Sequence, residues 1–188
     1  MGNNYYTGKG DRGDTGLFGS AERFPKSSLR YEALGTVDEA NSWLGLCKTK
    51  QSDPELKKIL EWVQQRLFTI QAELGGSDIH LEESHVKTLE AHIAKISETL
   101  PVIKTFVLPG ASEFAAHFDI ARTVVRTAER RIVALSHDQQ MMGAVQGRPR
   151  EFTLAFMNRL SSLLYVLARQ EAMKSGEAEK TPSYQYTE

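Results

Sequence analysis

The sequence predicts an all-α protein, in which an N-terminal glycine-rich arm precedes an up-and-down bundle of five helices. Long segments of the 188-residue chain repeat apolar residues at helical spacing, and capping residues, glycines and prolines separate these segments. The apolar stretch over 102–108 is typical of a short strand, but no second stretch could pair with it, and Pro109-Gly110 follows at once. We therefore expect this stretch to form a buried loop.

The chain divides into an arm over 1–27, a bundle over 28–175 and a polar tail over 176–188, within a single domain. Ser27 or Ser28 is expected to cap the first helix, and Asp53 followed by Pro54 gives a clear start to the second. The predicted helices cover about 28–50, 53–74, 81–100, 112–138 and 149–175. The arm is expected to be irregular, with disorder as the alternative, and the tail to be loose.

One acidic residue of the predicted first helix, Asp38, lies where a charged side chain would need a partner of opposite charge. At 100° per residue Asp38 falls on the face that carries Leu34 and Val37. A carboxylate on a core-facing stripe must be paired, because burial of an unpaired charge is costly. We expect Asp38 to meet a cation.

The predicted fourth helix carries Arg122, Arg126, Glu129 and Arg130 beside its apolar stripe. Arginine in such a position commonly binds phosphate or carboxylate through its planar guanidinium group. A solvated stripe of charges with i,i+4 pairs is the alternative. The fifth helix has a broad apolar face opposite a polar stripe that begins at Asn158, so we expect it to be buried on more than one side, with another subunit as one candidate for the second side.

The arm is dense in glycine, with Gly8, Gly10, Gly13 and Gly16 interleaved with Lys9, Asp11 and Asp14. Glycine lets backbone N–H groups approach a ligand closely, and donors with a cation suit a polyphosphate. The segment 8–13 matches G-x-G-x-x-G, yet no strand precedes it and no helix follows, so a Rossmann turn is excluded. A Walker A loop is excluded because Gly10 follows Lys9 where serine or threonine is required.

Composition argues against several other classes. The formal net charge is −1, which gives no global attraction to nucleic acid or to anionic membranes. No apolar run approaches the roughly 20 residues that span a bilayer, and no secretory signal is evident. The single Cys47 is expected to be packed in a core, in the reducing cytoplasm. His80, His85 and His92 are expected to be solvated, with no metal ligand set among protein side chains.

Five blocks of the chain together resemble the PduO-type corrinoid adenosyltransferases. These blocks are Thr7 to Gly19, Glu32 to Ser42, Phe106 to Gly110, Ala121 to Arg131 and Asn158 to Ser162. They occur in family order from residue 6 to residue 170, so the resemblance covers nearly the whole chain. Three departures are visible: Thr127 and Ser162 stand where the family has an arginine and an acid, and Gly8-Lys9 replaces the common Lys-Thr order.

The resemblance implies transfer of the 5′-deoxyadenosyl group of ATP to the cobalt of reduced cobalamin, with release of triphosphate. It implies a homotrimer with ATP at subunit interfaces and Mg²⁺ held mainly by ATP. A flavin or other reductase and an adenosylcobalamin-dependent enzyme would be partners. An ATP-binding corrinoid chaperone or sensor with little catalysis is the alternative, because it would use the same residues.

The resemblance also implies residue roles. ATP would be bound by Thr7, Gly8, Lys9, Gly10, Asp11, Gly16, Leu17, Lys26, Arg126, Glu129, Arg130 and Asn158. The residues implied for catalysis are Arg130, Asp38, Arg126 and Phe106. Asp38 would pair with Arg126 across the interface, and Phe106 would lie under the corrin and keep the lower cobalt ligand away.

Overall fold

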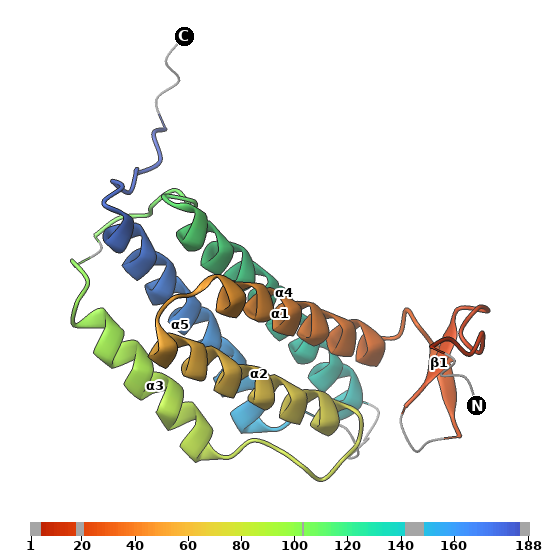
Figure 1. Cartoon of the computed structure of the whole chain (residues 1–188). Coiled ribbons are helices and arrows are strands. Elements are labelled where there is room, and N and C mark those ends of the chain that lie inside the picture. The colour runs from red at the N-terminus through yellow and green to blue at the C-terminus, as the bar shows by residue number, and fades with distance from the viewer. Residues whose placement is uncertain (1–4, 18–20, 103, 142–148, 185–188) are drawn as a thin grey trace.

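The computed structural model describes residues 5–17, 21–102, 104–141 and 149–184. Its helices are α1 (Leu29–Lys50), α2 (Pro54–Leu74), α3 (Glu83–Ser97), α4 (Glu113–Met141) and α5 (Glu151–Ser175) (Figure 1). The strands β1 (Asp14–Gly16) and β2 (Arg23–Pro25) precede them. The expected all-α, five-helix class is confirmed, with one small hairpin added.

Each helix packs against at least one other helix of the chain. Helix α5 packs against both α3 and α4, while α1 packs against α2 and α4. Burial of α5 on more than one side is therefore achieved by helices of its own chain. Its buried side chains include Phe156, Leu160, Leu164 and Leu167. Within the described residues, no helix is both long and apolar enough to cross a bilayer.

The arm is more regular than expected, because part of it forms an antiparallel hairpin. Thr15 of β1 lies opposite Phe24 of β2. The side chain of Arg23 holds the two strands together through the carboxylate of Asp14. Figure 1 shows the hairpin beyond the start of α1, apart from the body of the bundle. Residues 18–20, between the two strands, lie outside the described residues.

The ends of the first two helices follow the capping signals. Ser28 occupies the N-cap of α1, and the side chain of Asp53 accepts hydrogen bonds from the N–H groups of Glu55 and Leu56 at the start of α2. The later ends differ from expectation. α3 is shorter at both ends, α4 continues to Met141, and α5 begins at Glu151 rather than at Pro149. The remainder of the expected loop, 142–148, lies outside the described residues.

The buried face of α1 differs from the predicted one. Its core residues are Ala33, Val37, Ala40, Asn41, Leu44 and Cys47. Leu34 is only partly buried and Asp38 is exposed, so the prediction that Asp38 lies on the core-facing stripe was wrong. The prediction followed the large apolar residues, whereas the small side chains of Ala33 and Ala40 mark the face that packs against neighbouring helices.

The segment between α3 and α4 is also corrected. It is not a buried loop, since Val102 is 84% and Phe106 79% exposed. Ile103 lies outside the described residues. The beginning of the polar tail is not loose either, because the carbonyl of Lys180 accepts a 2.7 Å hydrogen bond from the N–H of Leu108.

Candidate functional site

The arm brings together two of the residues expected to bind ATP. The chain turns back after β2, and the N–H of Lys26 donates to the carbonyl of Gly13 at 2.9 Å. The Lys26 side chain then passes over Gly10, where an added Cβ would lie 3.1 Å from Nζ. Any side chain at position 10 would therefore displace this amine. The structure thus places a cation beside an exposed glycine-rich backbone.

Positive φ angles shape the arm at two glycines. Gly8 has φ +67° and Gly13 has φ +80°, values that favour glycine. Turns close from Asp11 N–H to the Gly8 carbonyl and from Gly13 N–H to the Gly10 carbonyl. The Thr7 hydroxyl accepts from the N–H of Lys9 at 3.3 Å. These contacts fold the segment 7–13 tightly on itself, in a form that other residues would resist.

Arg23 braces this fold, and the sequence reasoning missed it. Its Nη2 donates to the carbonyl of Lys9 at 2.6 Å and to Oδ1 of Asp14 at 2.8 Å. The hydrogen bond from Arg23 lowers the pKa of the Asp14 carboxyl. Asp14 therefore holds the hairpin as an anion. The only sequence feature that pointed to this bracing role was the presence of opposite charges, Asp14 and Arg23, on the two sides of the segment that joins the strands.

A second group of expected site residues lies where α4 faces α5. Nδ2 of Asn158 donates to Oε1 of Glu129 at 3.2 Å. Arg126 and Arg130 are exposed on the same helix as Glu129. Nη2 of Arg130 donates to the hydroxyl of Thr127 at 3.0 Å, so this threonine fixes one orientation of the guanidinium.

Other expected partners lie apart. In the described chain Asp38 accepts a 3.4 Å hydrogen bond from Nε2 of Gln71, at the limit of such contacts. Figure 1 shows the hairpin at the far end of the molecule from the loop before α4, which carries Phe106. Gly16 and Leu17 lie at the end of β1 and just beyond it. A single chain thus leaves the arm, the loop and the arginine face of α4 (Arg126 and Arg130) exposed.

Two of the buried acids, each bound to a residue of another segment, were missed altogether. Glu73, which is 2% exposed, accepts hydrogen bonds from the hydroxyl of Thr153 and from the N–H of Arg150. It thereby caps the start of α5 from a different helix. Asp119, which is 5% exposed, pairs with Arg169 of α5. Both acids lie on otherwise apolar helix faces, which was the available signal.

The histidines are only partly as predicted. His80 is exposed, but His85 and His92 are half-buried beside Trp62. Their solvation was therefore overestimated. Across the described ranges, no three His, Cys, Asp or Glu side chains gather as metal ligands would.

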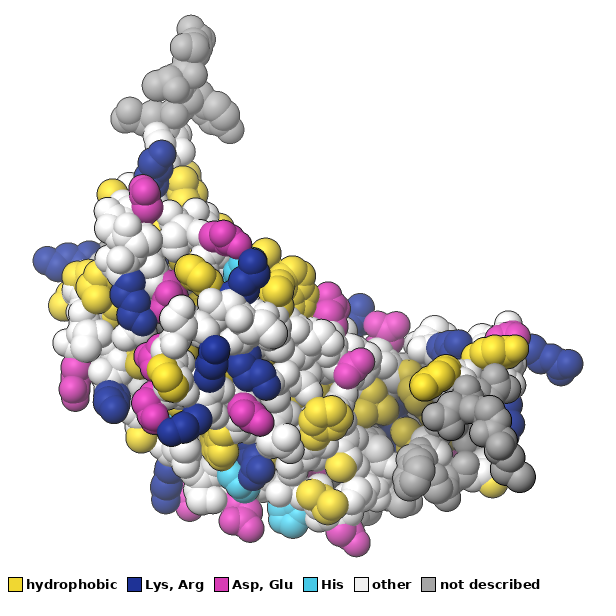
Figure 2. All heavy atoms as spheres, in the orientation of Figure 1, with side chains coloured by type: hydrophobic (Ala, Val, Ile, Leu, Met, Phe, Trp, Pro, Cys, Tyr) yellow, Lys and Arg dark blue, Asp and Glu magenta, His cyan; other side chains and the backbone are white. Residues whose placement is uncertain are grey.

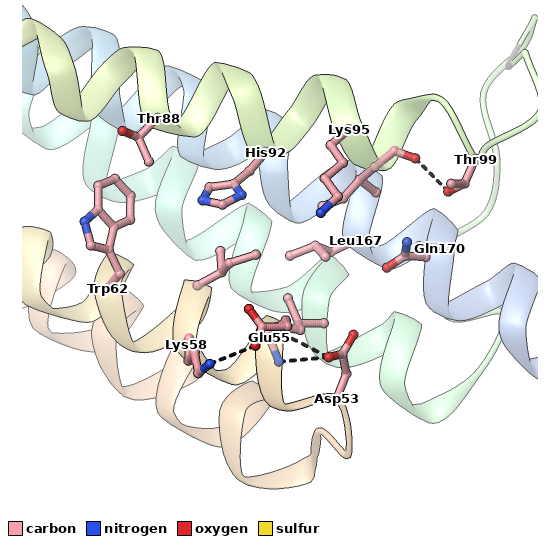
Figure 3. A pocket seen from close by; sticks show the side chains of 13 residues that line it. Asp53, Glu55, Lys58, Trp62, Thr88, His92, Lys95, Thr99, Leu167 and Gln170 are labelled. Carbon is pink, nitrogen blue, oxygen red and sulfur yellow. Dashed lines mark hydrogen bonds and ion pairs between the residues drawn. The ribbon is translucent and has the colours of Figure 1, made fainter.

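A separate groove of about 450 Å³ lies between α2 and α3, lined by Trp62, His92 and Leu167 (Figure 3). It contains none of the expected site residues. Acidic and basic side chains are interspersed on the face of the molecule in Figure 2.

Comparison with known proteins matches this arrangement to one family. The family model for cobalamin adenosyltransferases matches residues 5–171, which include the arm, the arginine face of α4 and Asn158. The chain is 37% identical over 88% of its length to the corrinoid adenosyltransferase PduO of Citrobacter freundii, of which it covers 49%. It spans about half the length of that relative. It is also 37% identical to the corrinoid adenosyltransferase of Bacillus subtilis, covering 91% of this chain and 88% of that one.

Solved structures agree with the sequence match. A phenylalanine-to-alanine variant of the PduO-type ATP:corrinoid adenosyltransferase of Lactobacillus reuteri, complexed with cobalamin and ATP, superposes with a TM-score of 0.82. The two chains are 30% identical, and the match covers 95% of this chain and 99% of the other. An arginine-to-lysine variant of that enzyme, complexed with ATP, gives a TM-score of 0.81. The chain therefore belongs to the cobalamin adenosyltransferase family.

Proposed function

We propose that this protein transfers the 5′-deoxyadenosyl group of ATP to the cobalt of a reduced corrinoid. In this reaction a bond forms between cobalt and C5′, the C5′–O bond breaks, and triphosphate leaves. The observation that carries the proposal is the family match over residues 5–171, which spans the arm and the arginine face together. Each of these surfaces separately would suit many anionic ligands.

In this proposal the arm binds the triphosphate. Its backbone N–H groups and the Lys26 amine beside Gly10 face the phosphates. Thr7, Lys9 and Asp11 bind at the turn, and Gly16 and Leu17 bind the rest of the nucleotide. The exposed acid Asp11 is free to orient water around a nucleotide-bound Mg²⁺, which supplies further charge neutralisation, whereas Asp14 is engaged by Arg23.

The other half of the ATP site comes from the arginine face of a second subunit in a homotrimer. Arg126, Glu129, Arg130 and Asn158 face the nucleotide, and Arg126 pairs with Asp38 across the interface. Support comes from the exposure of Asp38, Arg126 and Arg130 in the single chain. A pair between subunits would also give Asp38 the cation that α2 does not supply.

Catalysis then rests on positioning and on charge. Arg130 and Lys26 stabilise the departing triphosphate, and the arm aims C5′ at the cobalt. The protein itself supplies no nucleophile. Cys47 is buried, and burial raises the pKa of its thiol to about 12, so it stays protonated. A single buried, reduced thiol supports a cytoplasmic location.

The loop before α4 is assigned to the corrinoid. Phe106 is 79% exposed and stands before a Pro-Gly turn, with Gly110 at φ +87°. An apolar ring there offers a surface for the corrin and occupies the place of a lower ligand. A reductase and an adenosylcobalamin-dependent enzyme are the proposed partners, because the reaction consumes reduced cobalt and yields a cofactor.

The test is direct. Protein, ATP and Mg²⁺ are mixed with chemically reduced cobalamin, and absorbance is followed as the Co–C bond forms. Turnover that depends on both ATP and protein supports the proposal. Tight ATP binding without turnover would instead support the chaperone or sensor role, and absence of ATP binding would exclude both roles.

A further inference from the structure

A buried ionic network connects the loop of Phe106 to the chain that follows α5. Arg169 is 2% exposed and its Nη2 donates to both carboxylate oxygens of Asp119, at 3.1 and 2.9 Å. Nη1 of Arg169 lies 2.7 Å from Oε1 of Glu179, as an ion pair without hydrogen-bond alignment. Two of these charged groups are buried and Glu179 is partly buried, which is costly unless the three remain together.

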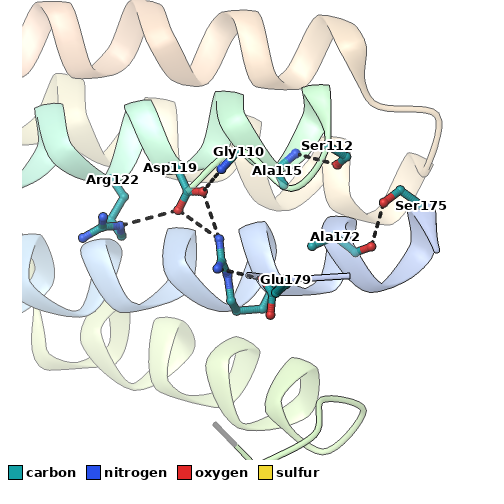
Figure 4. Close-up of polar contacts among 9 residues, drawn as sticks. Gly110, Ser112, Ala115, Asp119, Arg122, Ala172, Ser175 and Glu179 are labelled. Carbon is teal, nitrogen blue, oxygen red and sulfur yellow. Dashed lines mark hydrogen bonds and ion pairs between the residues drawn. The ribbon is translucent and has the colours of Figure 1, made fainter. Parts of the chain in front are cut away.

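This network reaches the loop by backbone contacts. Oδ2 of Asp119 accepts a 3.1 Å hydrogen bond from the N–H of Gly110 (Figure 4). The N–H of Leu108 donates to the carbonyl of Lys180, the residue after Glu179. Both N–H groups that flank Pro109 are therefore held by the network or by its immediate neighbour. Phe106 is two residues away and is mostly exposed, so its own packing does not fix the loop.

The segment 176–180 returns to the bundle because of a glycine. Gly176 ends α5 with φ +74°, a left-handed conformation that reverses the chain. This turn directs Glu179 back to Arg169, so the segment lies against both α5 and the loop. The side chain of Glu179 is only 22% exposed, although its neighbours Glu177 and Lys180 are exposed.

We propose that Asp119, Arg169 and Glu179 form a clamp by which the segment 176–180 sets the position of the Phe106 loop. They are positioning residues, and their effect falls on the corrinoid rather than on ATP. This inference rests on the proposed function for its kinetic consequence, though not for its structural one. A simple stabilising ion pair would not act selectively on one loop.

Glu179→Gln tests the clamp with little risk to folding, because Glu179 lies outside the helices. Glu177→Gln is the matched control, an exposed glutamate on the same segment. Hydrogen exchange is measured on the full chain by mass spectrometry. We expect peptides over 104–112 to exchange about tenfold faster in Glu179→Gln, with peptides from α1 and α2 unchanged. Glu177→Gln should exchange as the wild type does.

Kinetics supply the second readout. Glu179→Gln should raise KM for reduced cobalamin severalfold while Kd for ATP remains at the wild-type value. Wild-type loop exchange in Glu179→Gln would overturn the clamp, as would an equal change in cobalamin KM and ATP Kd. If the wild type forms no Co–C bond, the proposed function fails, but the exchange experiment still decides whether the clamp exists.

Discussion

Arg130 is an exposed arginine whose orientation is set by Thr127 and whose loss should not disturb the core. If it stabilises the departing triphosphate, Arg130→Ala should reduce kcat by about 100-fold or more, as removal of a transition-state donor does. The elution volume on size exclusion should stay that of the wild type.

Arg131→Ala is the matched control for this variant, because Arg131 is the neighbouring exposed residue and pairs with Glu32 of its own chain. It should retain most of the activity. Near-normal turnover in Arg130→Ala would remove Arg130 from the catalytic residues.

Glu73 presents a second residue-scale test, this time of stability. Both of its carboxylate oxygens lie within 3.1 Å of the Thr153 hydroxyl, at a site closed to solvent. Thr153→Val leaves part of a buried carboxylate unsatisfied and should lower the free energy of unfolding by about 1–3 kcal/mol. Urea denaturation measures this change.

Thr88→Val is the control here, since the exposed Thr88 donates only to the carbonyl of Ser84 on its own helix. If Thr153→Val and Thr88→Val lowered the free energy of unfolding equally, the contact between Glu73 and Thr153 would contribute nothing specific to stability.

These residues also show where prediction from sequence stopped. The rule that an acid on an apolar face requires a partner was sound, but it was applied to Asp38, which is exposed. Glu73 and Asp119 satisfy the rule with buried partners in other helices. The error arose at α1, where Ala33 and Ala40 define the buried face and the larger Leu34 does not.

The start of helix α3 is capped by the side chain of His85. Nδ1 of His85 accepts a 2.9 Å hydrogen bond from the N–H of Glu82, so this nitrogen must be unprotonated. Burial chiefly, and then the Arg66 guanidinium, lower the pKa of His85, with Glu82 opposing them. Burial and Lys95 likewise lower the pKa of His92 on the same helix.

A lowered pKa makes the fold less stable in acid. A base with a lower pKa in the folded state takes up a proton on unfolding. The stability it contributes is complete above the unfolded-state pKa near 6.5 and is lost as pH falls through the folded-state pKa. The urea concentration at the midpoint of unfolding should therefore decrease as the pH is lowered from about 7.5 to about 5.5.

His85→Gln should reduce this fall, because glutamine still offers an acceptor to Glu82 but does not titrate. Thr88→Val on the same helix should leave the pH dependence as it is. An identical pH dependence in His85→Gln and in the wild type would show that His85 carries none of it.

For the whole molecule, helical periodicity and capping signals were enough to predict five helices in order. The hairpin was missed because each strand has three residues, too few to show an alternating pattern of apolar residues. The strands are held together by the contact of Arg23 with Asp14, which lies nine residues earlier in the chain. The clamp on the Phe106 loop was missed for the same reason, since Asp119, Arg169 and Glu179 come from separate segments. The residue pattern within a segment predicts whether that segment is helical. Contacts between distant segments can be identified only once the fold is known.

The proposal that each ATP site combines the arm of one subunit with α4 of another leads to a test of assembly. Lys26→Ala removes the arm cation, and Arg130→Ala removes the helix cation, so each variant alone should be inactive. If each site combines one subunit's arm with its neighbour's α4, trimers reassembled from an equal mixture contain intact sites. A site is intact when the arm comes from the Arg130→Ala subunit and α4 from the Lys26→Ala subunit.

Random assembly gives that combination at about a quarter of the sites, so the mixture should recover about a quarter of the wild-type rate. The control is the same mixture without the dissociation step, which should remain inactive. A site built within one subunit would always carry one of the two substitutions, and no mixture would then regain activity. Recovery after reassembly would thus assign the two cations of one site to different chains.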